Sequence, residues 1–217
     1  MKLLNRSTLM ILLCSALLVP AIAAAAGEAS PHTFLKRTDG VIIVWNEDPA
    51  FFRVEFAGLN IRRSIKGNCG VWVSDHFYDI NVDDVAAFDG AALSGAELLR
   101  AHMQHTQKTW VEEAGMEMPL SERSIGTPLA ENMALWEIVW SKKARKALKD
   151  RKSASSVEKV LYLSVAVGER IVLISRPILK NEDVEQGYSY LSAIAESFQS
   201  SEKEINVGRV QREIQSR

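Results

Sequence analysis

Hydrophobic and polar residues alternate along short stretches in the first third of the chain. Between Phe52 and Phe56, aromatic and β-branched side chains alternate with charged ones, which is the two-residue period of a half-buried strand. The alternation continues through residues 59–65, and residues 71–80 are rich in β-branched and aromatic side chains. We therefore expect three or four antiparallel strands in this part of the chain.

A β-hairpin is predicted later in the chain, over residues 157–174. Its loop, Gly168-Glu169, places glycine at the first central position, as a type II′ turn requires. Both faces of the hairpin are largely apolar, whereas an antiparallel sheet open to solvent on one side alternates apolar and polar residues. We therefore expect this sheet to be covered on both faces. Residues 136–140 also alternate and predict a further strand.

Two segments have the 3.6-residue period of amphipathic helices. Ser94 and Glu97 have the spacing of a capping box, and Gly115 is the expected end of the helix that follows. Asn181 is the expected N-cap of the second helix. The apolar stripes comprise Leu99, Met103, Thr106 and Trp110 in the first helix, and Val184, Tyr188, Leu191, Ala195 and Phe198 in the second.

This order of elements predicts an α+β fold, in which an antiparallel β-sheet is covered by helices on both faces (an α/β/α sandwich) in a single domain. The arrangement resembles the PsbP and DcrB-like group of small α/β/α sandwich domains over residues 41–199. The resemblance is carried by the alternation in Phe52-Arg53-Val54-Glu55-Phe56, the Leu161–Ile174 hairpin, and Ile194-Ala195-Glu196-Ser197-Phe198. Members of that group are mostly accessory or binding proteins, so the resemblance implies a fold and a non-catalytic role, and assigns no role to any residue.

The first residues have the order of a cleavable signal peptide. Lys2 and Arg6 precede an apolar run at residues 9–19, and a small-residue stretch ends at Ala26. The run is too short for a helix that stays in a membrane, which needs about 20 residues. We expect an exported protein, periplasmic or secreted, with no transmembrane segment in the mature chain. The expected divisions are a signal peptide at 1–26, a flexible lead-in at 27–38, a globular domain at 39–200 and a polar, charged tail at 201–217.

The 217-residue chain carries 26 Lys and Arg against 27 Asp and Glu, a net charge of −1 at pH 7 with neutral histidines. A chain so close to neutrality does not coat a polyelectrolyte, so we expect no nucleic-acid partner. Cys69 is the one cysteine outside the signal segment. Two interpretations stay open for it: a buried apolar residue, or a thiol that pairs between chains.

A basic segment between two predicted strands is the strongest local departure from neutrality. Its cations are Lys142, Lys143, Arg145, Lys146 and Lys149, followed by Arg151 and Lys152. One interpretation is a loop that docks on an anionic membrane surface or an acidic protein partner. The other is a solvated connection kept soluble by its charge. The leading functional hypothesis is an exported accessory or binding domain without catalytic activity that docks through this basic loop.

The alternative hypothesis is a small extracytoplasmic enzyme or metal-dependent binder. His102 and His105 are three residues apart on a predicted helix, a spacing that suits two ligands of one metal ion, and the cluster from Asp75 to Asp83 would supply further ligands. Against it, the helical wheel places His105 well outside the apolar stripe and His102 beside it, as expected of surface histidines. We assign no catalytic residue, no metal and no cofactor.

The acidic cluster also matches the opening of a calcium-binding loop, at Asp79, Asn81 and Asp83. The match ends at the sixth and twelfth positions, because Asp84 stands where the loop needs glycine and Gly90 stands where it needs a bidentate glutamate. We therefore expect a solvated acidic loop.

The signal-peptide interpretation predicts where the mature chain begins. Ala24 and Ala26 place small side chains at both positions that the peptidase must fit, so the first residue should be Gly27 or lie within two residues of it. The intact mass of the exported protein measures this directly. A mass that includes a lipid on Cys14 would contradict the prediction.

Overall fold

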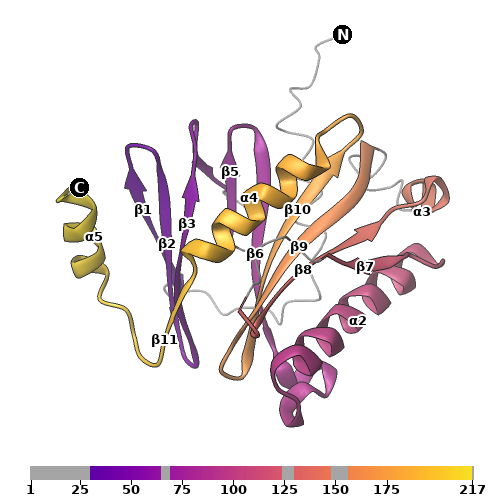
Figure 1. Ribbon diagram of the computed structural model, residues 1–217, viewed down its shortest axis with the longest axis horizontal. Helices are drawn as coiled ribbons and strands as arrows, with labels where there is room; N and C mark the ends of the chain where they lie inside the picture. Colours follow the sequence, from indigo (N-terminus) through magenta and orange to yellow (C-terminus); the bar gives the residue numbers. More distant parts are fainter. Residues whose placement is uncertain (1–29, 65–68, 124–129, 148–155, 217) are drawn as a thin grey trace.

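Two antiparallel β-sheets form the centre of the molecule in the computed structural model, which describes residues 30–64, 69–123, 130–147 and 156–216 (Figure 1). Within these ranges the larger sheet has seven strands in the order β4-β5-β6-β10-β9-β8-β7. Every neighbouring pair is antiparallel. The strands are β4 (Arg62–Arg63), β5 (Cys69–Val73), β6 (His76–Asp84), β7 (Leu120–Glu122), β8 (Met133–Val139), β9 (Val157–Val167) and β10 (Arg170–Leu179).

A smaller sheet packs against one face of the larger one. Its described strands follow the order β1-β2-β3-β11, with bounds β1 (His32–Arg37), β2 (Gly40–Glu47), β3 (Ala50–Ala57) and β11 (Gln199–Ser201). The alternation predicted at Phe52, Val54 and Phe56 is confirmed, because all three side chains are fully buried in the cluster between the sheets. Cys69 is buried in the same cluster, and burial raises the pKa of its thiol.

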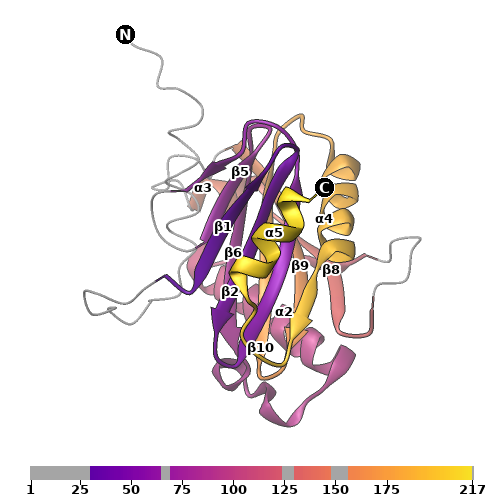
Figure 2. The same cartoon turned by 90° about the vertical axis from the view of Figure 1, so that its left-hand side faces the viewer.

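Helices cover the faces that the sheets leave open (Figures 1 and 2). α2 (Gly95–Ala114) lies on the face of the larger sheet turned away from the smaller sheet, and α4 (Val184–Ser197) lies on the opposite face, beside the smaller sheet. α5 (Val207–Gln215) covers the outer face of the smaller sheet. The short helices are η1 (Val85–Phe88), η2 (Gly90–Ala92) and α3 (Lys142–Ala147). The α+β fold, an antiparallel sheet with helices on both faces in a single domain, is therefore confirmed.

The hairpin predicted at residues 157–174 is confirmed as β9 and β10. Gly168 has a φ angle of 57°, and the register pairs Val165 with Val172, as the two-residue loop requires. Side chains of both strands alternate between the cluster under α2 and the cluster under α4 and the smaller sheet. Both faces are buried, which explains why these strands are apolar at nearly every position.

The separate smaller sheet is the main feature that the sequence analysis did not predict. Its strand β1 occupies part of the expected lead-in, residues 27–38. Phe34 in β1 packs against the cluster between the sheets, whereas its neighbour Leu35 packs on the other face, toward α5. A strand with apolar residues on both faces shows no two-residue alternation, so its pattern does not stand out from a loop.

Helix α5 lies in the segment expected to be a polar tail. Val210 is 3% exposed, and it packs with Ile214 against the outer face of the smaller sheet. The Asn46 side chain donates a hydrogen bond to the carbonyl of Ile205 and accepts one from its amide, both at 2.9 Å. This reciprocal pair fixes the segment that leads into α5.

The helix caps follow the predictions in part. Ser94 is the N-cap of α2, but its side chain makes no capping hydrogen bond. The N-cap of α4 is Asp183 instead of Asn181, because the Asp183 carboxylate accepts from the amides of Glu185 and Gln186 at 2.9 and 3.3 Å. Asn181 takes a left-handed conformation before the helix, with φ of 71°.

Phe198 should contribute strongly to stability because it closes α4 over the larger sheet. It is 8% exposed, and its ring stacks on Phe52 at 5.1 Å between centroids. Phe198→Ala should lower the free energy of unfolding by about 3 kcal/mol or more, since it removes buried area and leaves a cavity. Urea unfolding measures the change. A loss below about 1 kcal/mol would mean that the end of α4 is not docked in solution.

Candidate functional site

The predicted basic loop is a short helix in the structure. Residues Lys142–Ala147 form α3 directly after β8, and the Ser141 hydroxyl accepts a hydrogen bond from the amide of Ala144 at 3.0 Å. Ala144 is fully buried, so α3 is fixed to the core on one side. Lys149, with the basic residues that follow it, lies outside the described residues.

The lysines of α3 face solvent. Lys142, Lys143 and Lys146 are exposed, and no ion pair joins any of the three to another residue in the described ranges. Arg145 differs, because it is half-buried and its guanidinium lies 3.8 Å from the Glu158 carboxylate. The structure therefore divides the predicted site residues into three solvent-facing cations and one cation that is already paired.

Two of these charges lie at the end of α3 that disfavours cations. Lys142 and Lys143 occupy the first turn of the helix, where the partial positive charge of the helix N-terminus disfavours cations. The effect is on the order of 0.3–1 kcal/mol for an exposed charge. Lys142 and Lys143 therefore cost α3 a little local stability, whereas Lys146 lies in the last turn, where a cation is favourable.

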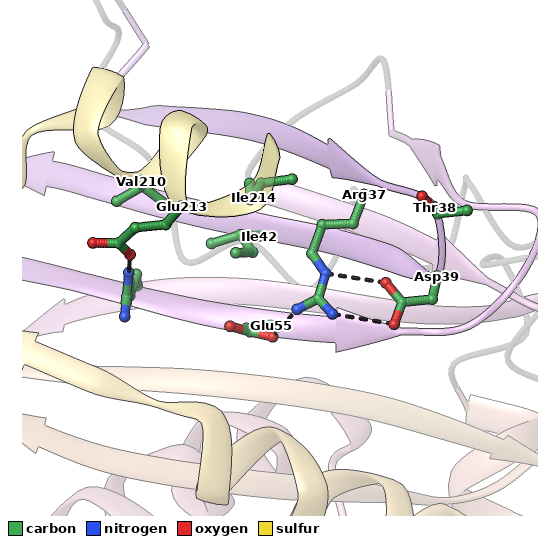
Figure 3. Close-up of a pocket in the computed structure, with 9 residues that line it drawn as sticks. Arg37, Thr38, Asp39, Ile42, Glu55, Val210, Glu213 and Ile214 are labelled. Atoms are coloured by element: carbon green, nitrogen blue, oxygen red, sulfur yellow. Dashed lines mark hydrogen bonds and ion pairs between the residues drawn. The ribbon is translucent and has the colours of Figure 1, made fainter. Parts of the chain in front are cut away.

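A separate groove lies between α5 and the outer face of the smaller sheet (Figure 3). It encloses about 320 Å³, and Ile42, Val210 and Ile214 form its apolar part. Its remaining lining residues are Arg37, Thr38, Asp39, Arg53, Glu55 and Glu213. The volume lies at the lower end of the range for small-molecule sites.

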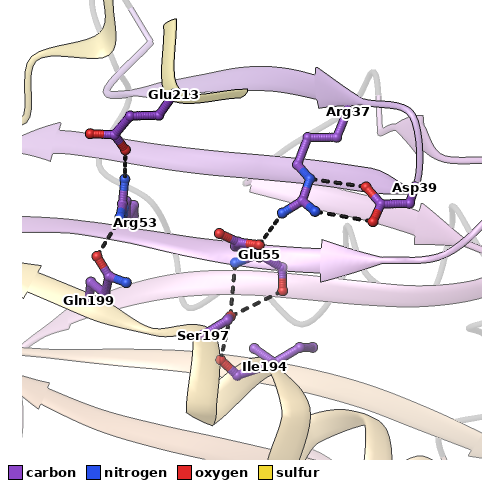
Figure 4. Close-up of polar contacts among 8 residues, drawn as sticks. All are labelled: Arg37, Asp39, Arg53, Glu55, Ile194, Ser197, Gln199 and Glu213. Carbon is purple, nitrogen blue, oxygen red and sulfur yellow. Dashed lines mark hydrogen bonds and ion pairs between the residues drawn. The ribbon is translucent and has the colours of Figure 1, made fainter. Parts of the chain in front are cut away.

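The charged groups of this groove neutralise one another (Figure 4). Arg37 binds Asp39 through two hydrogen bonds of 3.0 and 3.1 Å and also contacts the carboxylate of Glu55. Arg53 donates to Glu213 at 3.0 Å, and this hydrogen bond lowers the pKa of the Glu213 carboxyl. With every charge already paired, the groove offers no free cation or anion to an ionic ligand.

The sequence analysis did not find this groove. The outward-facing positions of Arg53 and Glu55 follow from the alternation in β3. Their partners lie far along the chain or in segments with no strand signal: Glu213 is 160 residues from Arg53. No sequence pattern indicates a pairing at that separation.

Among the described residues, the histidines of α2 do not gather into the metal site of the alternative hypothesis. His102 is completely buried, so its expected surface position is wrong, and its Nε2 lies 3.0 Å from Asp83 Oδ2. On its other side Nδ1 lies 3.5 Å from Ser164 Oγ, which accepts a hydrogen bond from the Trp136 indole at 2.9 Å. His105 lies beside Phe88, with 5.7 Å between ring centroids.

The Ser164-His102-Asp83 series has the residue types of a hydrolase triad, but its buried position indicates a structural role. His102 and Ser164 are both 0% exposed, so no substrate reaches the hydroxyl. The hydrogen bonds join α2 to β6 and β9, together with one from the Trp110 indole to the Tyr162 hydroxyl at 2.8 Å. These buried polar groups satisfy one another and fix the helix on the sheet.

The expected acidic loop is also wrong, because Asp79, Asn81 and Asp83 lie on strand β6. Asp79 is 4% exposed and accepts a hydrogen bond from the Asn81 amide at 3.1 Å. Burial raises the pKa of Asp79 to about 6. Asp75 is exposed in the turn before β6 and pairs with Arg62 at 3.2 Å. In the described ranges no three His, Cys, Asp or Glu side chains gather around one point as metal ligands would.

Comparisons with known proteins do not assign the chain to a family. No family model matches it, and no curated protein matches it. One solved structure that it resembles is the solution structure of cyanobacterial PsbP (CyanoP) from Synechocystis sp. PCC 6803, with 7% sequence identity and a TM-score of 0.39, covering 84% of this chain and 100% of that chain. A likeness at this level carries no argument about this chain. None of the helices in the described ranges combines the length and apolar character of a membrane span.

Asp79 makes the stability of the protein depend on pH. Its folded-state pKa of about 6 lies above the unfolded value of 3.8, so the folded state holds the proton more tightly. The free energy of unfolding should therefore fall as pH rises from about 4 to about 6. Asp79→Asn should remove this loss and raise stability at pH 7.5 by on the order of 2–3 kcal/mol, with little change at pH 3.5.

Urea unfolding of both proteins at pH 3.5 and pH 7.5 measures this difference. Asp75→Asn, at an exposed aspartate in the turn before the same strand, is the matched control and should leave the pH dependence unchanged. Equal effects of Asp79→Asn at the two pH values would show that the pKa of this carboxyl is the same in the folded and unfolded states.

Proposed function

We propose that this chain is an exported accessory domain that binds anionic surfaces through α3. Three features support the proposal: the signal-peptide pattern of the first residues, the solvent-facing lysines of α3, and the burial of Ala144 beneath them. The single observation that carries it is the set Lys142, Lys143 and Lys146, held on one rigid turn without carboxylate partners in the described ranges.

Rigid placement matters because the attractions of clustered charges add. All three lysines lie on a helix of six residues, which at 1.5 Å per residue is about 9 Å long. This length is close to the Debye length of about 8 Å at physiological ionic strength, so an anionic surface acts on the charges together. Each cation near such a surface contributes about 1 kcal/mol.

The groove beneath α5 is a less favourable site than α3 for an anionic partner. Its arginines are bound to carboxylates of the same chain, so an anionic ligand would have to displace those partners before binding. The α3 lysines lose only hydration and side-chain freedom. An electrostatic partner is therefore more favourably bound at α3 than at the groove.

Replacing the three lysines should abolish salt-sensitive binding. We expect the wild-type protein to sediment with vesicles that contain phosphatidylglycerol at low salt, and to be released as salt rises. Lys142→Gln, Lys143→Gln and Lys146→Gln together should weaken binding by about two orders of magnitude, at about fivefold per charge. The midpoint of urea unfolding should stay the same, because exposed substitutions change stability little.

A matched control removes three exposed cations elsewhere. Arg100→Gln, Lys108→Gln and Lys203→Gln change the net charge by the same amount, at positions on α2 and between β11 and α5. This variant should bind nearly as well as wild type. If the two triple variants lose binding equally, net charge and not α3 is responsible, and the proposal fails. Arg145 is left unchanged in both because it is paired with Glu158.

A further inference from the structure

The turns that join the strands place one set of charges at one end of the molecule. The β1–β2 turn, the end of β3, the β5–β6 turn, the end of β10 and the end of β8 all lie toward the upper side of Figure 1, with the β1–β2 turn on the left and α3 on the right. The amide of Ser74, in the β5–β6 turn, donates to the carbonyl of Leu59, which follows β3, at 3.0 Å. The ends of the two sheets are therefore in direct contact.

Cations and carboxylates are mixed at this end. Besides the α3 lysines, it presents Arg62 and Arg63 from β4 and Lys180 after β10, and all three are exposed. Arg62 pairs with Asp75 at 3.2 Å, and Asp39 and Asp183 are further exposed carboxylates here. Arg63 contacts rings instead of a carboxylate: its guanidinium lies 4.9 Å from the Phe34 ring and 3.3 Å from His32 Nε2. Burial, with a smaller contribution from Arg63, lowers the pKa of His32 to about 4, so this ring is neutral at pH 7.

Acidic residues gather at the opposite end, at the lower ends of the strands in Figure 1. They come from the β2–β3 turn, the end of β6, the β9–β10 turn and the segment after β11. The residues are Glu47, Asp48, Asp84, Glu169, Glu202 and Glu204. Arg170 and Lys203 lie at this end too, so acidic residues outnumber cations here. An anionic surface therefore repels this end more than the other, which orients the molecule.

The end that carries α3 also has an exposed apolar side chain. Leu59 is 69% exposed, and no other large hydrophobic side chain in the described ranges is exposed. Its turn is built to hold it outward. Gly58 has φ of 145°, and a Cβ atom there would lie 2.5 Å from Val73 Cγ1. Asn60 follows in a left-handed conformation, with φ of 54°.

Hydrogen bonds fix this turn in place. The Leu59 carbonyl accepts from both the amide and the hydroxyl of Ser74, at 3.0 and 3.3 Å. Single exposed apolar residues are common on protein surfaces and by themselves indicate nothing. Leu59 differs because a fixed turn presents it on the end of the molecule where Arg63, Lys180 and the α3 lysines lie.

The spacing of the cations selects the kind of partner. In the larger sheet, β4 and β8 are separated by the strands β5, β6, β10 and β9, so Arg63 lies about 24 Å from the strand that leads into α3, at about 4.8 Å per strand. A small anion cannot touch both Arg63 and the α3 lysines. A flat, extended anionic surface can, and a bilayer also offers an apolar layer beneath its charges.

We propose that this end docks on an anionic phospholipid bilayer, with Leu59 entering the apolar layer while Arg63 and the α3 lysines contact the headgroups. This inference rests on the proposed function of α3 and adds the partner and the orientation. Leucine burial and headgroup attraction act together, as in other peripheral proteins that combine an apolar contact with a basic patch.

The test places an environment-sensitive nitrobenzoxadiazole probe on Leu59→Cys, and on Glu202→Cys at the opposite end as the control. Both proteins begin at Gly27 and therefore lack Cys14, and Cys69 is buried, so the label goes to the introduced cysteine. With phosphatidylglycerol-containing vesicles, the probe at residue 59 should brighten and shift to shorter wavelength, and the probe at residue 202 should not change. Neutral phosphatidylcholine vesicles should change neither.

Unlabelled variants test the energetic contribution. Leu59→Asn should weaken vesicle binding by about tenfold, since partial burial of a leucine side chain accounts for roughly one decade in affinity. Leu59→Phe should bind at least as well as wild type. Neither change should move the unfolding midpoint, because the side chain is exposed. All variants share the same N-terminus, so any effect of the N-terminus on vesicle binding cancels in the comparison.

The outcomes separate this inference from the proposed function. If wild type binds the vesicles through α3 but the probe at residue 59 does not respond and Leu59→Asn binds normally, the bilayer orientation is wrong and the function of α3 stands. If polyglutamate binds as tightly as vesicles and Leu59 has no effect, the partner is an acidic protein and the inference is overturned. If wild type binds no anionic probe, the proposed function itself fails.

Discussion

The larger sheet has two apolar faces, and the rest of the molecule is arranged to cover both. β9 and β10 have buried side chains on each side, so neither face can remain in water without losing the burial that holds the strands together. One face is covered by α2. The other is too wide for α4 alone, and the smaller sheet fills the remaining area. This second layer then has an outer face of its own, which α5 covers. The layers therefore follow from the need to bury apolar sheet faces, first those of the larger sheet and then the outer face of the smaller sheet.

The elements that could be predicted from sequence are those with one clear period. The β9–β10 hairpin, the strand at Phe52–Phe56 and the long helices α2 and α4 each bury a single regular stripe or have an unambiguous turn. β1 and α5 were not predicted. β1 has one apolar residue packed on each face, Phe34 and Leu35, and the apolar stripe of α5 is narrow and interrupted by charged residues. Which strands form which sheet depends on contacts such as Ser74 with Leu59 and Gln199 with Arg53, and these leave no local pattern. The basic residues of α3 were found from composition alone, whereas their division into free and paired cations needed the position of Glu158.

Buried polar residues explain why sequence motifs misled at the alternative site. His102, Asp79 and Asp83 have the residue types of a metal or catalytic centre, and their spacing fits one. In the structure Asp79 and Asp83 lie on β6 and His102 lies on α2, and the hydrogen bond between His102 and Asp83 joins the helix to the strand. When layers of this size pack together, some polar groups are enclosed between them, and those groups must find hydrogen-bond partners there. Residue type and spacing therefore indicate a possible chemistry, and accessibility decides whether that chemistry is available.

The smaller sheet is closed by the last part of the chain. β11 pairs with β3 at Gln199 and Arg53, and Asn46 holds the main chain of Ile205 at a separation of 159 residues. Contacts between the two extremes of a sequence form slowly, because a long loop must close first. The early strands therefore cannot complete their sheet until nearly the whole chain is present. For a protein that crosses a membrane as an extended chain, as proposed, this order of synthesis delays folding until translocation is almost finished.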